Sequence, residues 1–355
     1  MKEIDKSKPV MVTGATGFVA GWIVKKLLDE GITVHAAVRS PNDKEKLKYL
    51  DELAAKSKGT IKYFKADLLE KGSYKAAMEG CELVYHTASP FKMVVKNNQK
   101  DLVEPALNGT KNVLESVNET PSVKRVVLTS SVASVYGDNK DADLIPGGIF
   151  TEEYWNITST LTHQPYSYSK VVAEKEAWTI NKLQNRWDLV TILPSFVLGP
   201  GINPRITSES FQIIRQLGNG LTKFGVPNLH LGEIDVRDLA EAQFKAGYTP
   251  TANGRYIISN EHITLLKIAQ ILRGKFGNKY PFPKSEFPKF LVWLFAPFAG
   301  YQRKMISNNI GIPLKLDNSK AIRELGMKYR PANETIIDFF QQMIDNGVFD
   351  KRKKN

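Results

Sequence analysis

The stretch Val12-Thr13-Gly14-Ala15-Thr16-Gly17-Phe18-Val19-Ala20 decides how the fold of this chain is interpreted. An apolar run at residues 9–12 precedes it, and an apolar stripe with helical spacing follows at residues 18–28. Gly14 permits a tight turn, and Gly17 lets the backbone approach a pyrophosphate. A helix that begins at such a turn favours anions, because its first N–H groups are free and its dipole is positive there. The stretch therefore predicts a dinucleotide-binding turn between a first strand and a first helix.

Strands and helices alternate along the next 180 or so residues. Their spacing is typical of parallel strands that are joined by helical crossovers. Strands are expected at residues 9–12, 32–38, 61–64, 83–86, 125–129 and 189–193. Helices are expected at residues 18–28, 43–53, 73–78, 102–117 and 166–183. The strands are apolar without alternation, as in a sheet that is covered on both faces. We predict an α/β fold with a doubly wound parallel (Rossmann) sheet.

The pattern changes after residue 193, where Pro194, Gly199-Pro200-Gly201 and Pro204 interrupt it. Residues 234–246 are expected to return to the core through a strand end and a helix. From residue 265 onward the chain is expected to be mostly helical, with a last helix at residues 334–344. We predict a dinucleotide-binding domain of residues 1–195 plus about 230–250. Residues of about 196–229 and 251–355 are expected to form a smaller, mostly helical substrate lobe over the carboxyl edge of the sheet, where ligands bind.

Composition limits the other classes of function. The chain has 355 residues, a formal net charge of +12 and one cysteine, Cys81, which favours a reducing, cytoplasmic location. The only dense basic run is Lys351-Arg352-Lys353-Lys354, and no nucleic-acid-binding pattern occurs. The longest apolar run, residues 290–298, is shorter than the roughly 20 residues of a membrane span. We expect a monomer or homodimer without a nucleic-acid partner or a membrane span.

The aromatic segment at residues 287–301 has two interpretations that the sequence leaves open. It could form the core of the smaller lobe, or part of an apolar wall around a substrate.

The end of the second strand indicates which dinucleotide binds. Enzymes that prefer NAD place a carboxylate there, whereas this chain has Arg39, which suits the 2′-phosphate of NADP. Lys44 could add positive charge. Asp67, after the third strand, could bind the adenine edge or cap a loop. His86 is expected to be a packed strand residue, and without a second His/Cys cluster we expect no metal site.

Tyr166 and Lys170 are the candidates for proton transfer. Residues four apart lie on the same face of a helix, so the two side chains are expected to point the same way. A nearby ammonium favours phenolate, which predicts a pKa for Tyr166 below about 10 and a tyrosine that exchanges a proton near neutral pH. Tyr168 has no such partner.

Two serines, Ser130 and Ser131, follow the fifth strand, and either hydroxyl could hold a substrate oxygen or simply cap the strand.

In this order, the glycine turn, the serine-bearing strand end and Tyr166-x-x-x-Lys170 resemble the extended short-chain dehydrogenase/reductases of the NAD-dependent epimerase/dehydratase family. The finer resemblance is to dihydroflavonol 4-reductases, cinnamoyl-CoA reductases and yeast methylglyoxal (ketone) reductases. It rests on Val38-Arg39, His86-Thr87-Ala88-Ser89-Pro90-Phe91, residues 126–131, residues 166–170 with Ala173-Glu174-Lys175, Leu193-Pro194 with Gly199-Pro200, and residues 234–238.

The resemblance implies roles for individual residues. Ser131 matches the catalytic serine, with Ser130 as its rival, Tyr166 matches the proton donor, and Lys170 matches the partner that also holds the nicotinamide ribose. The expected cofactor-binding residues are Gly14, Thr16, Gly17, Phe18, Val19, Arg39, Lys44, Asp67, Leu68, Thr87, Ala88, Ser89, Thr129, Tyr166, Lys170, Pro194 and Val197. The candidate substrate-binding residues are Phe91, Ser131, Tyr154, His163, Phe196 and Phe224.

The activity that this resemblance implies is an NADP(H)-dependent reduction of an aldehyde or ketone to an alcohol, with a small carbonyl compound, apolar or aromatic, as the partner. A nucleotide-sugar epimerase or dehydratase shares the fold, but Arg39 replaces the acidic residue of epimerases and Val132-Ala133 replaces the Asp-Glu pair of dehydratases. A 3β-hydroxysteroid dehydrogenase-like enzyme is another alternative. A non-catalytic NADP-binding regulator is the alternative outside enzymes, although such proteins often lose the tyrosine or lysine kept here.

Overall fold

A computed structural model describes residues 2–89, 95–203 and 208–350 of the chain. Its main sheet has seven strands within these residues, in the spatial order β10-β6-β5-β4-β1-β2-β3. All of the pairings in this sheet are parallel. The strands are β1 (Val10–Thr13), β2 (Val34–Val38), β3 (Ile61–Lys65), β4 (Leu83–His86), β5 (Arg125–Thr129), β6 (Asp188–Pro194) and β10 (Gly254–Ile258).

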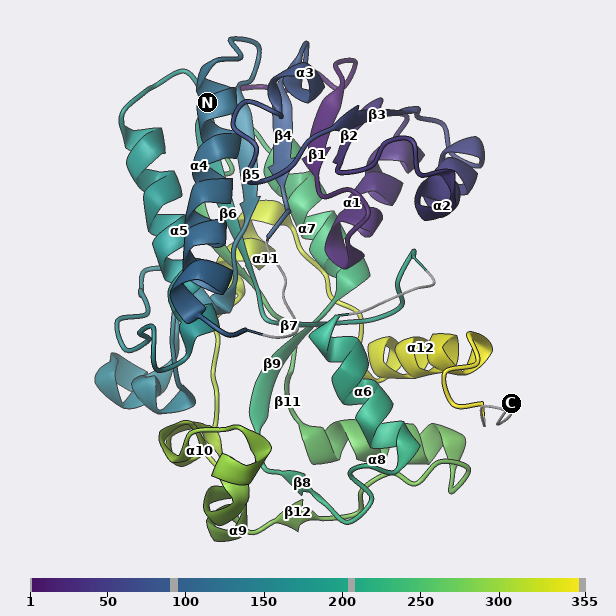
Figure 1. The fold of residues 1–355 in the computed structure, drawn as a ribbon, viewed down its shortest axis with the longest axis vertical. Coiled ribbons are helices and arrows are strands. Elements are labelled where there is room, and N and C mark those ends of the chain that lie inside the picture. Colours follow the sequence, from purple (N-terminus) through teal and green to yellow (C-terminus); the bar gives the residue numbers. More distant parts are fainter. Residues whose placement is uncertain (1, 90–94, 204–207, 351–355) are drawn as a thin grey trace.

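Helices cover both faces of this sheet (Figure 1). On one face, α1 (Phe18–Asp29), α2 (Lys44–Ala55) and α7 (Val236–Tyr248) pack over the strands. On the other face lie α3 (Lys75–Met78), α4 (Glu104–Asn118) and α5 (Pro165–Lys182), and a π-helical turn, Gln99–Val103, leads into α4. The predicted doubly wound α/β fold is therefore confirmed, and each strand and helix predicted before residue 194 is present within a few residues of its expected bounds.

One strand of the sheet was not predicted. Residues 254–258 form β10, which pairs with β6 and is covered by α11 (Ser319–Leu325), although this segment was assigned to the smaller lobe. Only three apolar residues, Tyr256-Ile257-Ile258, mark the strand, and it follows the segment in which the strand–helix alternation is lost. Pairing with an existing strand and coverage by a distant helix create it, so a local pattern could not reveal it.

The smaller lobe combines helices with short strands. A three-stranded sheet contains β7 (Phe196–Leu198), β9 (His230–Asp235) and β11 (His262–Thr264), and β8 (Val226–Pro227) pairs with β12 (Glu286–Phe287). The helices are α6 (Glu209–Asn219), α8 (Leu265–Phe276), α9 (Lys289–Phe295), α10 (Arg303–Asn309) and α12 (Ala332–Asp345). Short 3₁₀ helices are Val132–Ser134, Asn139–Leu144, Pro146–Gly148 and Ala296–Ala299. Within the described residues, no helix is long and apolar enough to cross a membrane.

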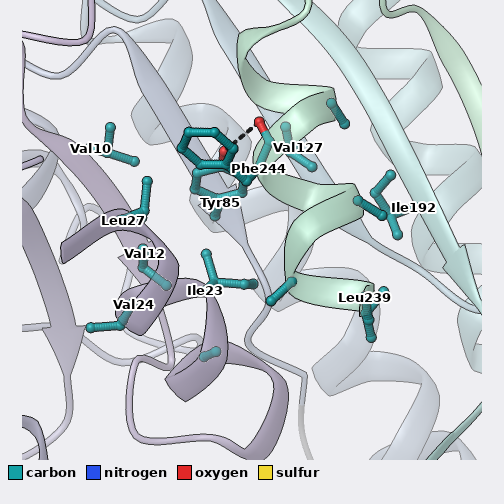
Figure 2. Packing of buried hydrophobic residues seen from close by; sticks show 14 of the residues in the cluster. Val10, Val12, Ile23, Val24, Leu27, Tyr85, Val127, Ile192, Leu239 and Phe244 are labelled. Carbon is teal, nitrogen blue, oxygen red and sulfur yellow. Dashed lines mark hydrogen bonds between the residues drawn. The ribbon is translucent and has the colours of Figure 1, made fainter. Parts of the chain in front are cut away.

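The core between α1, α7 and the central strands holds the sheet and its helices together. Figure 2 shows Tyr85 of β4 among side chains of α1, where its hydroxyl donates a 3.5 Å hydrogen bond to the Phe244 carbonyl of α7. Gly247, one turn later on α7, leaves room for this ring, because a Cβ there would collide with Tyr85 Oη and lie 2.8 Å from Leu83 Cδ2. Close approach of α7 to β4 therefore requires glycine at position 247.

We predict that Gly247→Ala lowers the free energy of unfolding by about 1–3 kcal/mol, because the added methyl group overpacks a site whose neighbours are fully buried. Gly274→Ala is the matched control. Gly274 is exposed on α8 and a Cβ there would meet nothing within 4 Å, so the same substitution should stabilise the protein by about 0.5–1 kcal/mol. Urea denaturation of both variants measures the difference, and equal stability of Gly247→Ala and the parent protein would contradict the packing described here.

Candidate active site

The glycine turn between β1 and α1 fits a dinucleotide phosphate group. Gly14 has φ +61°, and a Cβ there would lie 3.1 Å from the Ala88 Cβ, so a larger residue would strain the turn. The Gly17 N–H donates to the Gly14 carbonyl over 2.8 Å. Among the described residues no side chain caps the N-terminus of α1, and its first turn has no acidic residue. The first N–H groups of α1 thus remain available to an anion.

Thr13 fixes this turn to the neighbouring strand β4. Its hydroxyl accepts hydrogen bonds from the backbone N–H groups of Thr87 (3.0 Å) and Ala88 (2.9 Å) and lies 3.1 Å from His86 Nδ1. Burial, aided by the nearby Lys170, lowers the pKa of His86 to about 3, so its imidazole is neutral and Nδ1 accepts the Thr13 proton. His86 is therefore the packed strand residue that we expected. Thr13 was not predicted as a site residue, although it directly precedes Gly14.

Arg39, the residue predicted to bind the 2′-phosphate of NADP, lies at the end of β2. It follows β2 and is exposed, and it has no ion-pair partner among the residues that the structure describes. Lys44, the first residue of α2, is also exposed. The Asp67 carboxylate stabilises its own loop, because it accepts a hydrogen bond from the Leu69 N–H over 2.9 Å. A cationic position at the end of β2 is thus open to an anion.

The two candidate serines have different surroundings. The Ser130 hydroxyl is buried and donates to Glu174 Oε2 over 2.6 Å, and Glu174 also accepts from Arg255 Nε over 2.8 Å. Ser131 instead faces the Tyr166 hydroxyl as a hydrogen-bond partner and accepts from the Ala133 N–H over 3.2 Å. Ser130 therefore belongs to a buried polar network, and Ser131 is the serine that lies beside the tyrosine.

Tyr166 and Lys170 project from the first turns of α5, but their electrostatics differ from the prediction. Burial raises the pKa of Tyr166 to about 12, Glu209 raises it further, and the contact with Ser131 opposes both. The predicted depression of this pKa is wrong for this structure. The Lys170 ammonium lies over the ring, 5.6 Å from its centroid, and donates to Ser89 Oγ over 3.1 Å. Tyr166 is half-exposed (51 %), so solvent moderates the shift.

Burial also acts on Lys170. It lowers the pKa of the Lys170 ammonium to about 8, and only the charge of Glu174 opposes this change. A cavity of about 20 Å³, room for about one water molecule, lies beside Lys170 and is also bordered by Thr129, Ser130 and Ala88. The Thr129 hydroxyl is buried and has no hydrogen-bond partner among the described residues.

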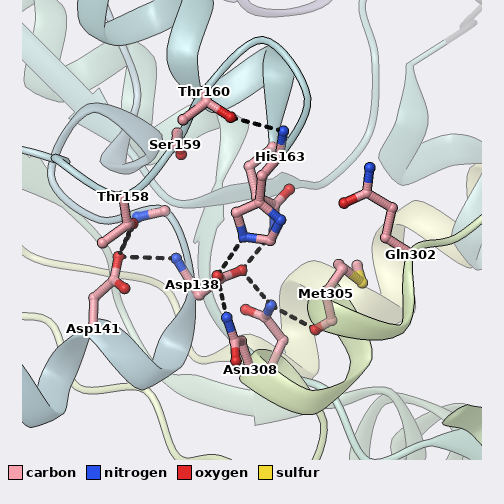
Figure 3. A network of polar contacts seen from close by, with 12 residues as sticks. Asp138, Asp141, Thr158, Ser159, Thr160, His163, Gln302, Met305 and Asn308 are labelled. Carbon is pink, nitrogen blue, oxygen red and sulfur yellow. Dashed lines mark hydrogen bonds and ion pairs between the residues drawn. The ribbon is translucent and has the colours of Figure 1, made fainter.

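The start of α5 is held by a buried carboxylate that the sequence did not single out. Asp138 lies 2.6 Å from His163 Nε2 and accepts from Gln164 (3.0 Å), Asn308 (2.8 Å) and Asn309 (2.7 Å), as Figure 3 shows in part. Burial acts to raise the pKa of Asp138, but these hydrogen bonds hold it below its ordinary value. Gln164 has φ +54°, the left-handed conformation, immediately before α5 begins. The network thus joins the helix that carries Tyr166 to α10 of the smaller lobe.

The candidate substrate residues differ in how far they are buried and in what they contact. His163 is buried in the Asp138 network (5 % exposed), where its Nε2 contacts Asp138, and its role as a substrate residue stays a prediction. Tyr154 packs against the cluster of Val132 and Phe150, and Phe196 packs against the core of the smaller lobe. Phe224 is exposed beside β8, with Lys223 over its ring. Phe91 lies outside the described residues.

The remaining expected cofactor residues are spread along the carboxyl edge of the sheet. Pro194 is buried at the end of β6, Val197 lies in β7, and Leu68 packs against Gly109 of α4. Within the described part of the chain, no group of three or more His, Cys, Asp or Glu side chains could hold a metal ion.

A parallel Rossmann sheet with a phosphate-binding glycine turn and a Ser-Tyr-Lys group at its carboxyl edge defines the class of extended short-chain dehydrogenase/reductases. Residues 10–258 match the model of the NAD dependent epimerase/dehydratase family, and the chain belongs to that family.

Known proteins narrow this assignment. The chain is 35% identical to cinnamoyl-CoA reductase CAD2 of Medicago truncatula over 97% of this chain and 98% of that protein. It is 31% identical to dihydroflavonol 4-reductase of Gerbera hybrida over 78% and 75% of the two chains. Its structure is similar to that of yeast methylglyoxal/isovaleraldehyde reductase Gre2 complexed with NADPH, with a TM-score of 0.78, 28% identity and coverage of 96% and 99%.

These relatives confirm the predicted branch and the predicted class of enzyme. The chain is an oxidoreductase that acts on alcohol and carbonyl groups. The predicted cofactor, NADP(H), is the one with which the yeast enzyme was crystallised.

We predict that the Lys170 amine titrates near pH 8, so that about half of it is reactive there, against well under 1 % for a lysine of pKa about 10.4. Trace acetylation with acetic anhydride across a pH series, read by peptide mass spectrometry, measures this midpoint. Lys175, exposed on the same helix, is the comparison residue. A labelling midpoint for Lys170 that coincides with that of Lys175 would show that burial does not act on Lys170.

Proposed function

We propose that this chain catalyses the NADPH-dependent reduction of an aldehyde or ketone to an alcohol, with Tyr166 as the proton donor. The observation that carries the proposal is the meeting of Ser131, Tyr166 and Lys170 beside the glycine turn, at one edge of the sheet.

NADPH, when bound, supplies the hydride. The substrate oxygen lies between the hydroxyl groups of Ser131 and Tyr166, and both donate hydrogen bonds to it as negative charge develops, in the manner of an oxyanion hole. Because the pKa of Tyr166 is raised, the phenol is protonated at neutral pH, which is the form that a reduction requires. Tyr166 then passes its proton to the alkoxide, a stronger base than phenolate. The Lys170 cation, one helical turn away, stabilises the phenolate that remains.

The residues at the glycine turn and at the end of β2 would hold the cofactor. The free N–H groups of α1 would bind the pyrophosphate, Arg39 would form charge-assisted hydrogen bonds with the 2′-phosphate, and Lys44 would add positive charge. Lys170 reaches Ser89, so both side chains border the place where the family's nicotinamide ribose lies. The NADPH complex of the yeast relative supports this choice over NADH.

The substrate is proposed to be a small apolar or aromatic carbonyl compound. Relatives named for cinnamoyl-CoA and dihydroflavonol support an aromatic substrate class. Residues 196–229 and 251–355, apart from β10, are proposed to form the substrate lobe. Val132-Ala133 stand where a dehydratase would have an acidic pair, and Arg39 stands where an epimerase would have a carboxylate, so reduction is favoured over both.

Tyr166→Phe is predicted to lower kcat with a reactive aldehyde by roughly 10²–10⁴-fold, because the proton donor is lost. Tyr168→Phe, two residues along the same helix, is the matched control and should retain activity.

Ser131→Ala should also lower kcat, whereas Ser130→Ala should mainly reduce stability because it breaks the hydrogen bond to Glu174. Loss of NADPH absorbance with a panel of aldehydes and ketones measures turnover, and an unchanged kcat in Tyr166→Phe would refute the proposed mechanism.

Arg39→Asp is predicted to weaken NADPH binding by about 10–100-fold, since it replaces a charge-assisted contact with repulsion. NADH, which lacks the 2′-phosphate, should bind the variant at least as well as the parent protein. Isothermal titration with both cofactors provides a readout that does not depend on turnover. A proportional loss of affinity for both cofactors would place Arg39 outside the 2′-phosphate site.

A further inference from the structure

Six large apolar side chains of α9 and of the segment that joins it to α10 are exposed at one end of the smaller lobe. They form what we call the aromatic patch: Phe290, Trp293, Leu294, Phe295, Phe298 and Tyr301. Phe298 is 87 % exposed and Phe290 67 %, and none of the residues of α9, all of which the structure describes, is buried. The segment is therefore not the core of the lobe, and clustered apolar exposure of this kind indicates an interaction surface.

The aromatic patch is held on a fixed platform. Val292 and Met305 pack beneath it against a small core of Ala296, Ile306 and Ile310. The Arg303 guanidinium lies over the Trp293 ring at 4.4 Å, and Gln302 donates to the Thr162 carbonyl over 2.6 Å. The exposed side chains are thus presented by an anchored segment, which reduces the ordering entropy that binding would cost.

Basic residues adjoin these apolar side chains in the sequence. Residues 287–304 contain three basic residues, Lys289, Arg303 and Lys304, and no acidic residue, so their formal net charge is +3. The Arg303 guanidinium contacts the aromatic patch directly through Trp293. Two copies of the chain that met through this surface would bring like charges together, which disfavours self-association. An anionic partner with an apolar interior complements both properties.

We propose that the aromatic patch docks the protein on the surface of an anionic lipid bilayer. Tryptophan and tyrosine rings favour the boundary between headgroups and hydrocarbon, and the basic side chains can reach anionic headgroups around them. The seven-residue α9 is far too short to span the bilayer, so it lies in the plane of the interface with its aromatic side chains inserted. This assignment does not depend on the proposed reductase activity.

The first test is co-sedimentation of the full chain with phosphatidylcholine vesicles, with and without phosphatidylserine. The protein should sediment with the anionic vesicles, and added salt should weaken this binding. The double variant Phe290→Ser, Phe298→Ser should lower the partition coefficient by at least about tenfold. Leu183→Ser is the matched control, because Leu183 is equally exposed (84 %) at the C-terminal end of α5, outside the aromatic patch, and should bind as the parent does.

Charge and insertion are tested separately. Lys289→Glu with Lys304→Glu should abolish the preference for phosphatidylserine. Insertion should shift the tryptophan emission to the blue, and Trp293→Phe should remove that shift, since Trp293 is the tryptophan in the aromatic patch.

Several outcomes would overturn the assignment. One is the absence of binding to anionic vesicles, and another is equal binding by the Phe290→Ser, Phe298→Ser variant with an unchanged circular dichroism melt. A dimer in light scattering that this double variant dissociates would assign the aromatic patch to a second copy of the chain.

Discussion

The buried carboxylate of Glu174 is the point on which the position of the active site depends. It accepts hydrogen bonds from Arg255 on β10, Ser130 after β5 and Thr191 on β6, so one side chain of α5 is joined to three strands. Glu174 lies one helical turn beyond Lys170 and two beyond Tyr166. Removing one partner of such a buried ion pair costs about 3–5 kcal/mol because the other charge is left unpaired. The orientation of α5 therefore depends on Arg255 of β10, which lies 81 positions from Glu174 in the sequence.

A second buried carboxylate, Asp138, acts at the N-terminal end of the same helix. Asp138 accepts hydrogen bonds from Gln164, which precedes α5, and from Asn308 and Asn309 of the smaller lobe. Tyr166 lies between these two anchors, in a half-exposed position at the mouth of the site. Because both carboxylates are satisfied by several donors, their burial specifies one arrangement of α5. The tyrosine is thus placed by polar contacts that do not touch the reacting atoms.

Much of this architecture could be predicted from the sequence, because the signals are local. Apolar runs followed by a glycine turn or a helical stripe identified β1 to β6, and the i, i+4 spacing put Tyr166 and Lys170 on one helix. β10 was not predicted, because this strand forms by pairing with β6, which ends 60 residues earlier in the sequence. The pKa of Tyr166 was mispredicted because i, i+4 spacing shows neither the burial of the phenol nor the Glu209 charge, and both of these raise the pKa. The contact of His163 with Asp138 could not be predicted, because the two residues lie 25 positions apart in the sequence.

The late arrival of β10 bears on how the chain folds during synthesis. Pro194 ends β6 and Gly254 begins β10, so 60 residues separate the last two strands of the sheet. At about 5–20 residues per second, the ribosome needs roughly 3–12 s to make that interval. During this time Glu174 has no Arg255 to neutralise it, and the open edge of β6 is a template for wrong pairing. A nascent chain that has not yet reached residue 258 therefore has a sheet without its edge strand, and β6 stays open to pairing with another chain until β10 has been made.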